Sequence, residues 1–111
     1  MTYDTVRKIA LTFPHVEEGM SYGTPALKVK KKLFVRLKED PDSIVLKMPF
    51  EQREALMAEE PETYYITEHY RNYEYMLVRL SRVSEDAIRD LLKVAYRSAL
   101  SEKPAAKRRK R

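Results

Sequence analysis

The chain of 111 residues contains no cysteine and only two glycines. The lack of cysteine excludes disulfides, thiolate zinc sites and cysteine nucleophiles, and two glycines are too few for a glycine-rich phosphate loop. No apolar run approaches the ~20 residues of a membrane helix, and none resembles the apolar segment of a signal peptide. We therefore expect a soluble, cytoplasmic protein that does not bind membranes.

Acidic residues are missing from two stretches of the chain, although the net charge is only +5. The first stretch is the end of the chain after Pro104, which carries Lys107, Arg108, Arg109, Lys110 and Arg111. Without these five, 17 basic residues balance 17 acidic ones, so residues 1–103 are electroneutral. The tail, residues 104–111, has no core-forming residue, and we expect it to be disordered.

The second stretch without acids is residues 28–38, KVKKKLFVRLK, a positive patch within the neutral body. Its six basic residues are Lys28, Lys30, Lys31, Lys32, Arg36 and Lys38. Lysines on an edge hairpin also prevent aggregation between sheet edges, which is a purely structural alternative. We favour a role in binding nucleic acid, in which the hairpin lies along a phosphate backbone.

Hydrophobic spacing predicts a helix near the N-terminus capped by Thr2, an extended piece at 16–22, and two strands within 25–38 joined near Lys31. A further strand is expected at 43–48, a helix at 50–59 and β-type segments at 63–67 and 73–83. Ser84 is the predicted N-cap of the last helix. Its buried stripe is expected to be Ile88, Leu91, Leu92, Ala95 and Ala99.

Helices set apart from runs of strands indicate an α+β domain, a two-layer sandwich with an antiparallel sheet, over residues 1–103. Helices would cover one face of the sheet. The chain offers little to cover the other face, which we expect to be largely open.

The two glycines lie in GMSYG, which has the G-x-S-x-G spacing of a hydrolase nucleophile elbow around Ser21. An elbow needs a helix directly after the serine, whereas a β-type run follows here. We therefore predict that Gly19 and Gly23 serve positions with φ > 0 or close backbone approach. His15, Glu17 and Glu18 lack the spacing of a zinc site. We expect no catalytic residues, no metal and no cofactor.

Five of the eight tyrosines fall within residues 64–75, mixed with basic side chains. Aromatic and basic groups together can stack on bases and pair with phosphates, but tyrosine is also common in half-buried strands. We favour packing for most of them. Tyr70 and Tyr73, in the polar loop, are expected to be the most exposed.

The segments SYGTPALKVKKKLFVRL and YYITEHYRNYEYMLVRL resemble the MmcQ/YjbR family of small bacterial proteins, which are described as DNA-binding. The resemblance runs from the first helix to about residue 100. It implies a helix–three strands–helix–two strands–helix order, of YjbR-like, secretion-chaperone-like or CyaY-like topology, with two β wings as the contact surface and no enzymatic residues. The sequence departs from the family at Lys31 and Asn72, where glycine is usual. Because lysine tolerates φ > 0 poorly, we expect a different turn type at 30–32.

Our sequence-based hypothesis is a non-enzymatic DNA-binding domain without strong sequence specificity. The contacts would come from the hairpin, from His69, Tyr70 and Arg71, and from the basic tail. The alternative is a protein- or small-molecule-binding module that uses the open face of the sheet, with monomer and homodimer both possible.

Overall fold

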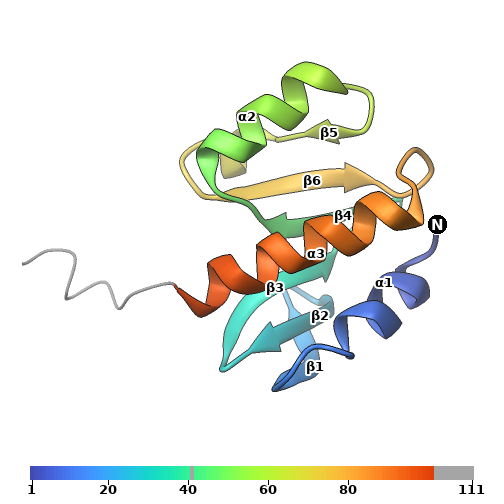
Figure 1. The fold of residues 1–111 in the computed structure, drawn as a ribbon, viewed down its shortest axis with the longest axis vertical. Coiled ribbons are helices and arrows are strands. Elements are labelled where there is room, and N and C mark those ends of the chain that lie inside the picture. The colour runs from blue at the N-terminus through green and yellow to red at the C-terminus, as the bar shows by residue number, and fades with distance from the viewer. Residues whose placement is uncertain (41, 102–111) are drawn as a thin grey trace, which may run out of the picture.

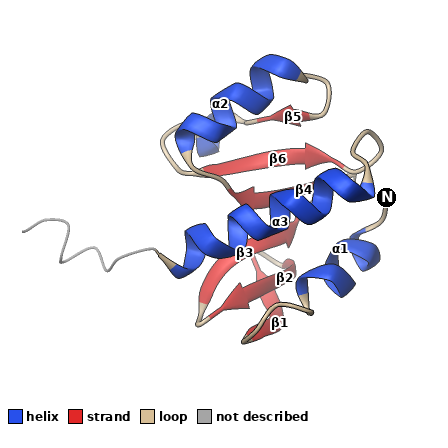
Figure 2. Ribbon diagram, in the orientation of Figure 1, coloured by secondary structure: helices blue, strands red, loops and turns tan. Residues whose placement is uncertain are grey.

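The computed structural model describes residues 1–40 and 42–101, and within them the chain forms two layers (Figures 1 and 2). The elements are α1 (Tyr3–Ala10), β1 (Val16–Ser21), β2 (Thr24–Val29), β3 (Lys32–Leu37), β4 (Ser43–Lys47), α2 (Phe50–Glu59), β5 (Tyr64–Tyr65), the short 3-10 turn η1 (Glu68–Tyr70), β6 (Tyr75–Arg79) and α3 (Glu85–Leu100).

The six strands of this described part form one sheet in the order β1-β2-β3-β4-β6-β5, with every neighbouring pair antiparallel. The predicted α+β class with an antiparallel sheet is therefore confirmed. Between α1 and α2 the chain makes four strands, one more than the three that the resemblance implies. The extended piece expected at 16–22 is the edge strand β1, which pairs with β2 along its whole length from Val16 to Ser21.

The helix ends follow the capping residues of the sequence. The hydroxyl of Thr2 accepts a hydrogen bond from the backbone N–H of Thr5, and that of Ser84 accepts one from Ala87. Both N-caps are confirmed, because each satisfies a backbone donor at the first turn. All five residues of the predicted stripe on α3 are buried.

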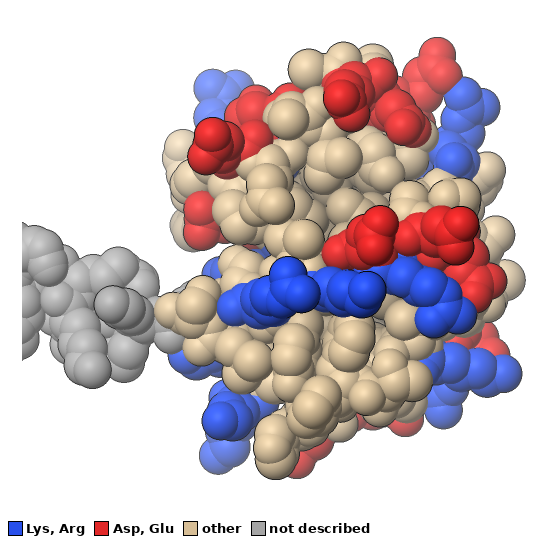
Figure 3. Space-filling view, in the orientation of Figure 1, with Lys and Arg blue, Asp and Glu red and all other residues tan. Residues whose placement is uncertain are grey.

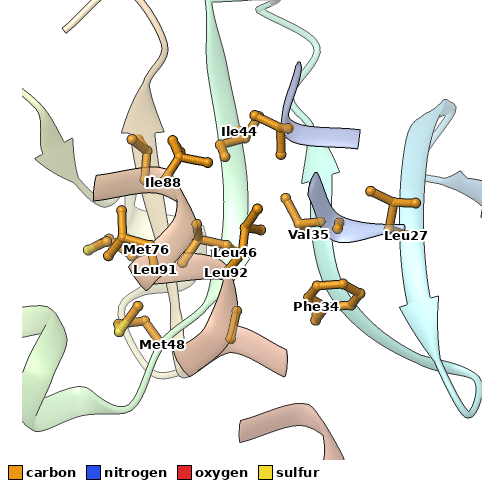
Figure 4. Packing of buried hydrophobic residues seen from close by; sticks show 14 of the residues in the cluster. Leu27, Phe34, Val35, Ile44, Leu46, Met48, Met76, Ile88, Leu91 and Leu92 are labelled. Atoms are coloured by element: carbon orange, nitrogen blue, oxygen red, sulfur yellow. The ribbon is translucent and has the colours of Figure 1, made fainter. Parts of the chain in front are cut away.

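The main core lies between the sheet and the helices, with α3 running across β2, β3 and β4 (Figure 4). Phe34, Leu46 and Leu92 are fully buried there. The ring of Tyr96 in α3 packs against Phe34 at 5.9 Å and against Phe13 at 4.9 Å between centroids. These contacts place the C-terminal half of α3 over the start of β3.

The opposite face of the sheet has its own small cluster, formed by Val45, Leu77 and Tyr70. Tyr70 belongs to η1, so the chain folds back over this face after β5. Ile66 and Tyr65 pack against the same cluster. The expectation that this face has little cover is therefore wrong over its centre, because residues 65–75 lie across it.

Two-residue turns join β1 to β2 and β2 to β3, and both turns have positive φ at each central residue. The values are 55° and 80° at Tyr22 and Gly23, and 50° and 70° at Lys30 and Lys31. These are the values of type I′ hairpins, whose twist matches that of the strands. The expectation of a different turn type at 30–32 is wrong: strand pairing holds two lysines in the left-handed region.

The two glycines have different roles. Gly23 has φ of 80°, as the sequence predicts, since glycine adopts this region without steric cost. Gly19 lies within β1 with no positive φ, and a Cβ added there would meet no atom within 4 Å. Neither of the predicted reasons applies to Gly19.

Among the described residues, no helix is long and apolar enough to cross a membrane. The predicted disordered tail, residues 104–111, lies outside the described residues.

Candidate nucleic-acid interface

The predicted basic hairpin exists, and its tip is its most exposed part. Lys30 and Lys31 form the turn and are exposed, whereas Lys28 and Lys32 in the adjoining strands are half-buried. Lys28 is the register partner of Glu17 in β1, which places an acidic residue beside it. Positive charge available to a partner is therefore concentrated at the tip.

Arg36 was expected to contact nucleic acid, and the structure contradicts this. The residue is only 4% exposed. Its guanidinium donates hydrogen bonds to the hydroxyls of Thr24 and Tyr70, at 3.2 and 2.8 Å, and to the carbonyl of Leu37 at 3.2 Å. Arg36 lies on the face opposite the helices, as the register partner of Val45, and this face is where residues 65–75 fold over it.

The expected exposure of Tyr70 is also wrong, because its ring packs in the second cluster and its hydroxyl accepts the hydrogen bond from Arg36. Tyr73 is 58% exposed, as predicted. His69 and Arg71 are exposed beside it. The carboxylate of Glu68 accepts a hydrogen bond from Arg71 at 2.8 Å, so the charge of Arg71 is partly neutralised within its own turn.

The structure separates the two predicted contact regions. Arg36, which touches η1, lies five residues along β3 from Lys31 at the hairpin tip. A strand rises about 3.3 Å per residue, so the tip lies roughly 16 Å along β3 from the residue that Tyr70 contacts. The tip and η1 are therefore at different points along this strand.

Sequence reasoning missed a second basic feature, a row along the exposed side of α3. Arg89, Lys93 and Arg97 recur every four residues, which places them on one face of the helix. Figure 3 shows basic side chains following one another along α3. Arg89 pairs with Glu85 at 2.7 Å, whereas Lys93 and Arg97 make no ion pair among the described residues. The four-residue spacing was visible in the sequence. The apolar stripe of the same helix has similar spacing, so the basic residues looked like an ordinary solvent-facing side of that helix.

The C-terminal part of the row on α3 and the hairpin tip lie at the same end of the domain. Tyr96, next to Arg97 in the chain, contacts the ring of Phe34, which follows the tip by three residues. In Figure 1 the turn between β2 and β3 and the C-terminal end of α3 lie on the same side of the view. The chain continues from this end towards the basic residues 107–111.

Acidic side chains gather around α2 and beside the N-terminal part of α3 (Figure 3). The exposed acidic residues on α2 and just after it are Glu51, Glu54, Glu59, Glu60 and Glu62. The single basic residue of α2, Arg53, is buried. Exposed acidic residues also lie in β1 (Glu17 and Glu18) and in the first half of α3 (Glu85, Asp86 and Asp90), so the separation of charge is partial. The hairpin tip and the C-terminal half of α3 carry exposed basic residues, and α2 carries a group of acidic ones.

The structure does not support the nucleophile elbow or a metal site. Ser21 ends β1, and the turn that follows leads into β2, whereas a nucleophile elbow leads into a helix. Within residues 1–40 and 42–101, no group of His, Cys, Asp or Glu side chains gathers in a way that could hold a metal ion.

The YjbR family model matches residues 11–98, and the chain belongs to this family. Among solved structures, the chain is similar to the crystal structure of Deinococcus radiodurans protein DR2400, described by the domain DUF419. The TM-score is 0.79 at 23% identity, and the alignment covers 97% of this chain and 86% of the other. This likeness supports the fold alone. No curated protein matches the chain.

Proposed function

We propose that this YjbR-family protein is a non-enzymatic DNA-binding domain that holds the phosphate backbone with the hairpin tip and the C-terminal half of α3. The observation that carries the proposal is the group of exposed cations at one end of a neutral body. Lys30, Lys31, Lys93 and Arg97 are exposed there, and five exposed acidic residues lie on or just after α2. A local group of cations attracts a polyanion to that part of the surface.

Phosphate contacts of this kind give affinity without sequence readout, since base edges are not touched. Four lysine and arginine contacts would give a log–log salt slope of about −3.6 on duplex DNA, at ~0.9 per contact. Basic residues 107–111 would add to this slope, because they follow α3 in the chain.

The test is a fluorescence anisotropy titration of a short duplex at several salt concentrations. The double variant Lys30→Gln/Lys31→Gln should lower the slope by about 1.8, and Lys93→Gln/Arg97→Gln should do the same. The matched control is Lys8→Gln/Arg82→Gln, which removes the same charge from exposed positions in α1 and in the turn before α3. The control should leave the slope nearly unchanged.

Two further variants separate the predicted contact regions. Deletion of residues 104–111 measures the contribution of the tail, and Arg71→Gln tests whether η1 takes part. If the control lowers affinity as much as the tip variant does, net charge alone explains the binding. If the wild type does not bind duplex DNA at low salt, the proposal is wrong.

A further inference from the structure

A pocket of about 250 Å³ lies on the face of the sheet opposite the helices. It is enclosed by the turn between β1 and β2, the end of β3 and the segment around η1. The buried side chains of Arg36 and Tyr70 line its inner part, and Tyr22 and His69, both exposed, stand at its rim. This volume is below the ~300–1,000 Å³ usual for drug-sized ligands, so it suits a small molecule.

The charge of Arg36 is poorly balanced. Its side chain is 5% exposed, and the hydrogen-bond acceptors around it are hydroxyl and carbonyl oxygens, all of them neutral. Its Nε atom has no hydrogen-bond partner among the described residues. A buried guanidinium needs an anion to offset its loss of hydration.

One carboxylate, that of Glu39, approaches Arg36, and its position indicates where an anion could bind. The two oxygens of Glu39 face two different cations, one 3.6 Å from Arg36 and the other 3.7 Å from Lys38. Both distances exceed those of charge-assisted hydrogen bonds, which are about 2.7–2.9 Å. Glu39 is also 58% exposed and can swing away into solvent. It marks a place where a carboxylate lies between two cations without being tightly held.

The electrostatic environment at this place favours negative charge. The pKa of Glu39 is lowered, chiefly by a hydrogen bond from its own backbone N–H. Burial is the next largest effect and opposes this, while the charges of Arg36 and Lys38 lower the pKa further.

Aromatic rings adjoin this anion position. The ring of Tyr22 lies over the guanidinium of Arg36, with 4.9 Å between its centroid and Cζ. Tyr22 is 69% exposed and has φ of 55°, a conformation that a bulky side chain disfavours. Strained residues of this kind are frequent at binding sites. The rim therefore offers a flat apolar surface beside two positive charges.

We propose that this pocket binds a small organic anion, a carboxylate or phosphate monoester attached to a planar ring. The anionic group would displace Glu39 from between Arg36 and Lys38, and the ring would lie against Tyr22. This site is separate from the hairpin tip and α3, and the proposal stands without DNA binding.

The experiment is an NMR titration of the full chain labelled with ¹⁵N, using four probes. Benzoate and phenyl phosphate carry the two candidate anionic groups on a ring, benzamide carries the ring without charge, and inorganic phosphate carries charge without a ring. We expect saturable shifts at residues 22–24, 36–39 and 67–70 with at least one of the two aromatic anions. The stronger of these two identifies the anionic group, and benzamide and inorganic phosphate should each bind about tenfold more weakly.

Three variants exchange one charge for an amide. Lys38→Gln should weaken binding about tenfold, because a charge-assisted contact is lost. Glu39→Gln should strengthen it about threefold, since the internal competitor loses its charge. Lys28→Gln removes a lysine outside the pocket and should leave binding unchanged.

Each variant should have the melting temperature of the wild type, so that a change in binding is not a loss of folding. Absence of saturable shifts with both aromatic anions would show that Arg36 only anchors Tyr70. Equal binding of benzamide, or equal losses in the Lys38 and Lys28 variants, would also overturn the proposal, because local recognition of the anion would then be absent.

Discussion

The two faces of the sheet are held by different kinds of contact. On the helix side, apolar side chains such as Leu46, Phe34 and Leu92 are fully buried in one continuous cluster. On the opposite side, a small cluster around Val45 and Leu77 is completed by polar groups. There Arg36 hydrogen-bonds Tyr70, while the hydroxyls of Ser43 and Tyr65 lie 2.8 Å apart.

The difference shows where specificity and stability come from in a small domain. Burial of apolar area stabilises the helix side without directional requirements. Hydrogen bonds to buried charges are directional, so they fix residues 65–75 in one arrangement while adding less net stability. This second arrangement also forms the pocket at Arg36, so the polar face is the one with a candidate small-molecule site.

Truncating a buried side chain on the apolar side should cause the largest loss of stability. Leu92→Ala removes a fully buried side chain that packs between α3 and the sheet. We expect a loss of about 2–5 kcal/mol in the free energy of unfolding, from lost transfer energy and the cavity left behind. Urea denaturation measures it. Leu100→Ala is the control on the same helix, at a position 40% exposed, and should change stability by less than ~1 kcal/mol. Similar losses of stability in Leu92→Ala and Leu100→Ala would show that burial on the helix side is not the main source of stability.

The second largest loss of stability is expected on the polar side, on substitution of Arg53. This residue of α2 is 3% exposed and donates hydrogen bonds to the backbone carbonyls of Tyr70, Arg71, Tyr73 and Tyr75. Arg53→Met keeps the length of the side chain but removes its donors, so each of these carbonyls loses a hydrogen bond. We expect a loss of about 2–3 kcal/mol, and hydrogen exchange should accelerate first in residues 70–75.

The control for Arg53 is Glu54→Gln, which removes only its exposed carboxylate partner at 3.2 Å. A surface ion pair contributes ~1 kcal/mol at most. If hydrogen exchange in Arg53→Met rises equally throughout the domain, Arg53 supports the whole fold and has no special role in residues 70–75.

Local sequence patterns predicted the helix side well. The stripe of α3 is visible because its apolar residues recur at helical spacing, and the caps Thr2 and Ser84 precede acidic first turns. The strands alternate with period two, which revealed the sheet. Each of these features is encoded by neighbours in the chain.

The polar side could not be predicted in the same way, because its contacts join distant residues. Arg36 and Tyr70 are 34 positions apart, and nothing near either one shows that they meet. Arg36 looked like one more cation of a basic hairpin, and Tyr70 like part of a polar loop. The row on α3 was within reach of sequence reasoning, whereas the closeness of that row to the hairpin tip depends on the packing of Tyr96 on Phe34.

A single hydroxyl tests the link between Arg36 and η1. Tyr70→Phe keeps the ring in its cluster and removes the acceptor that lies 2.8 Å from Arg36. We expect a loss of about 1.5–2 kcal/mol, in the range for hydrogen bonds to charged groups. Tyr73→Phe is the control, since this tyrosine is 58% exposed and should be nearly silent in the same urea titration. Equal stability of the two variants would mean that water replaces the hydroxyl at Arg36.

The smallest effect is expected at the hairpin tip, which belongs to neither face. Lys31 has φ of 70°, a conformation that costs an L-residue roughly 1–2 kcal/mol and glycine almost nothing. Lys31→Gly should therefore stabilise the domain, by about 0.5–1 kcal/mol after the greater freedom of glycine in the unfolded chain is subtracted. Lys31→Ala is the matched control, because it removes the same charge but keeps the Cβ and the strain. Both variants should lose the same increment of salt slope in DNA binding, while only the glycine variant gains stability in urea. A gain in both would attribute the effect to relief of repulsion among the lysines, and would show that the left-handed turn carries no strain.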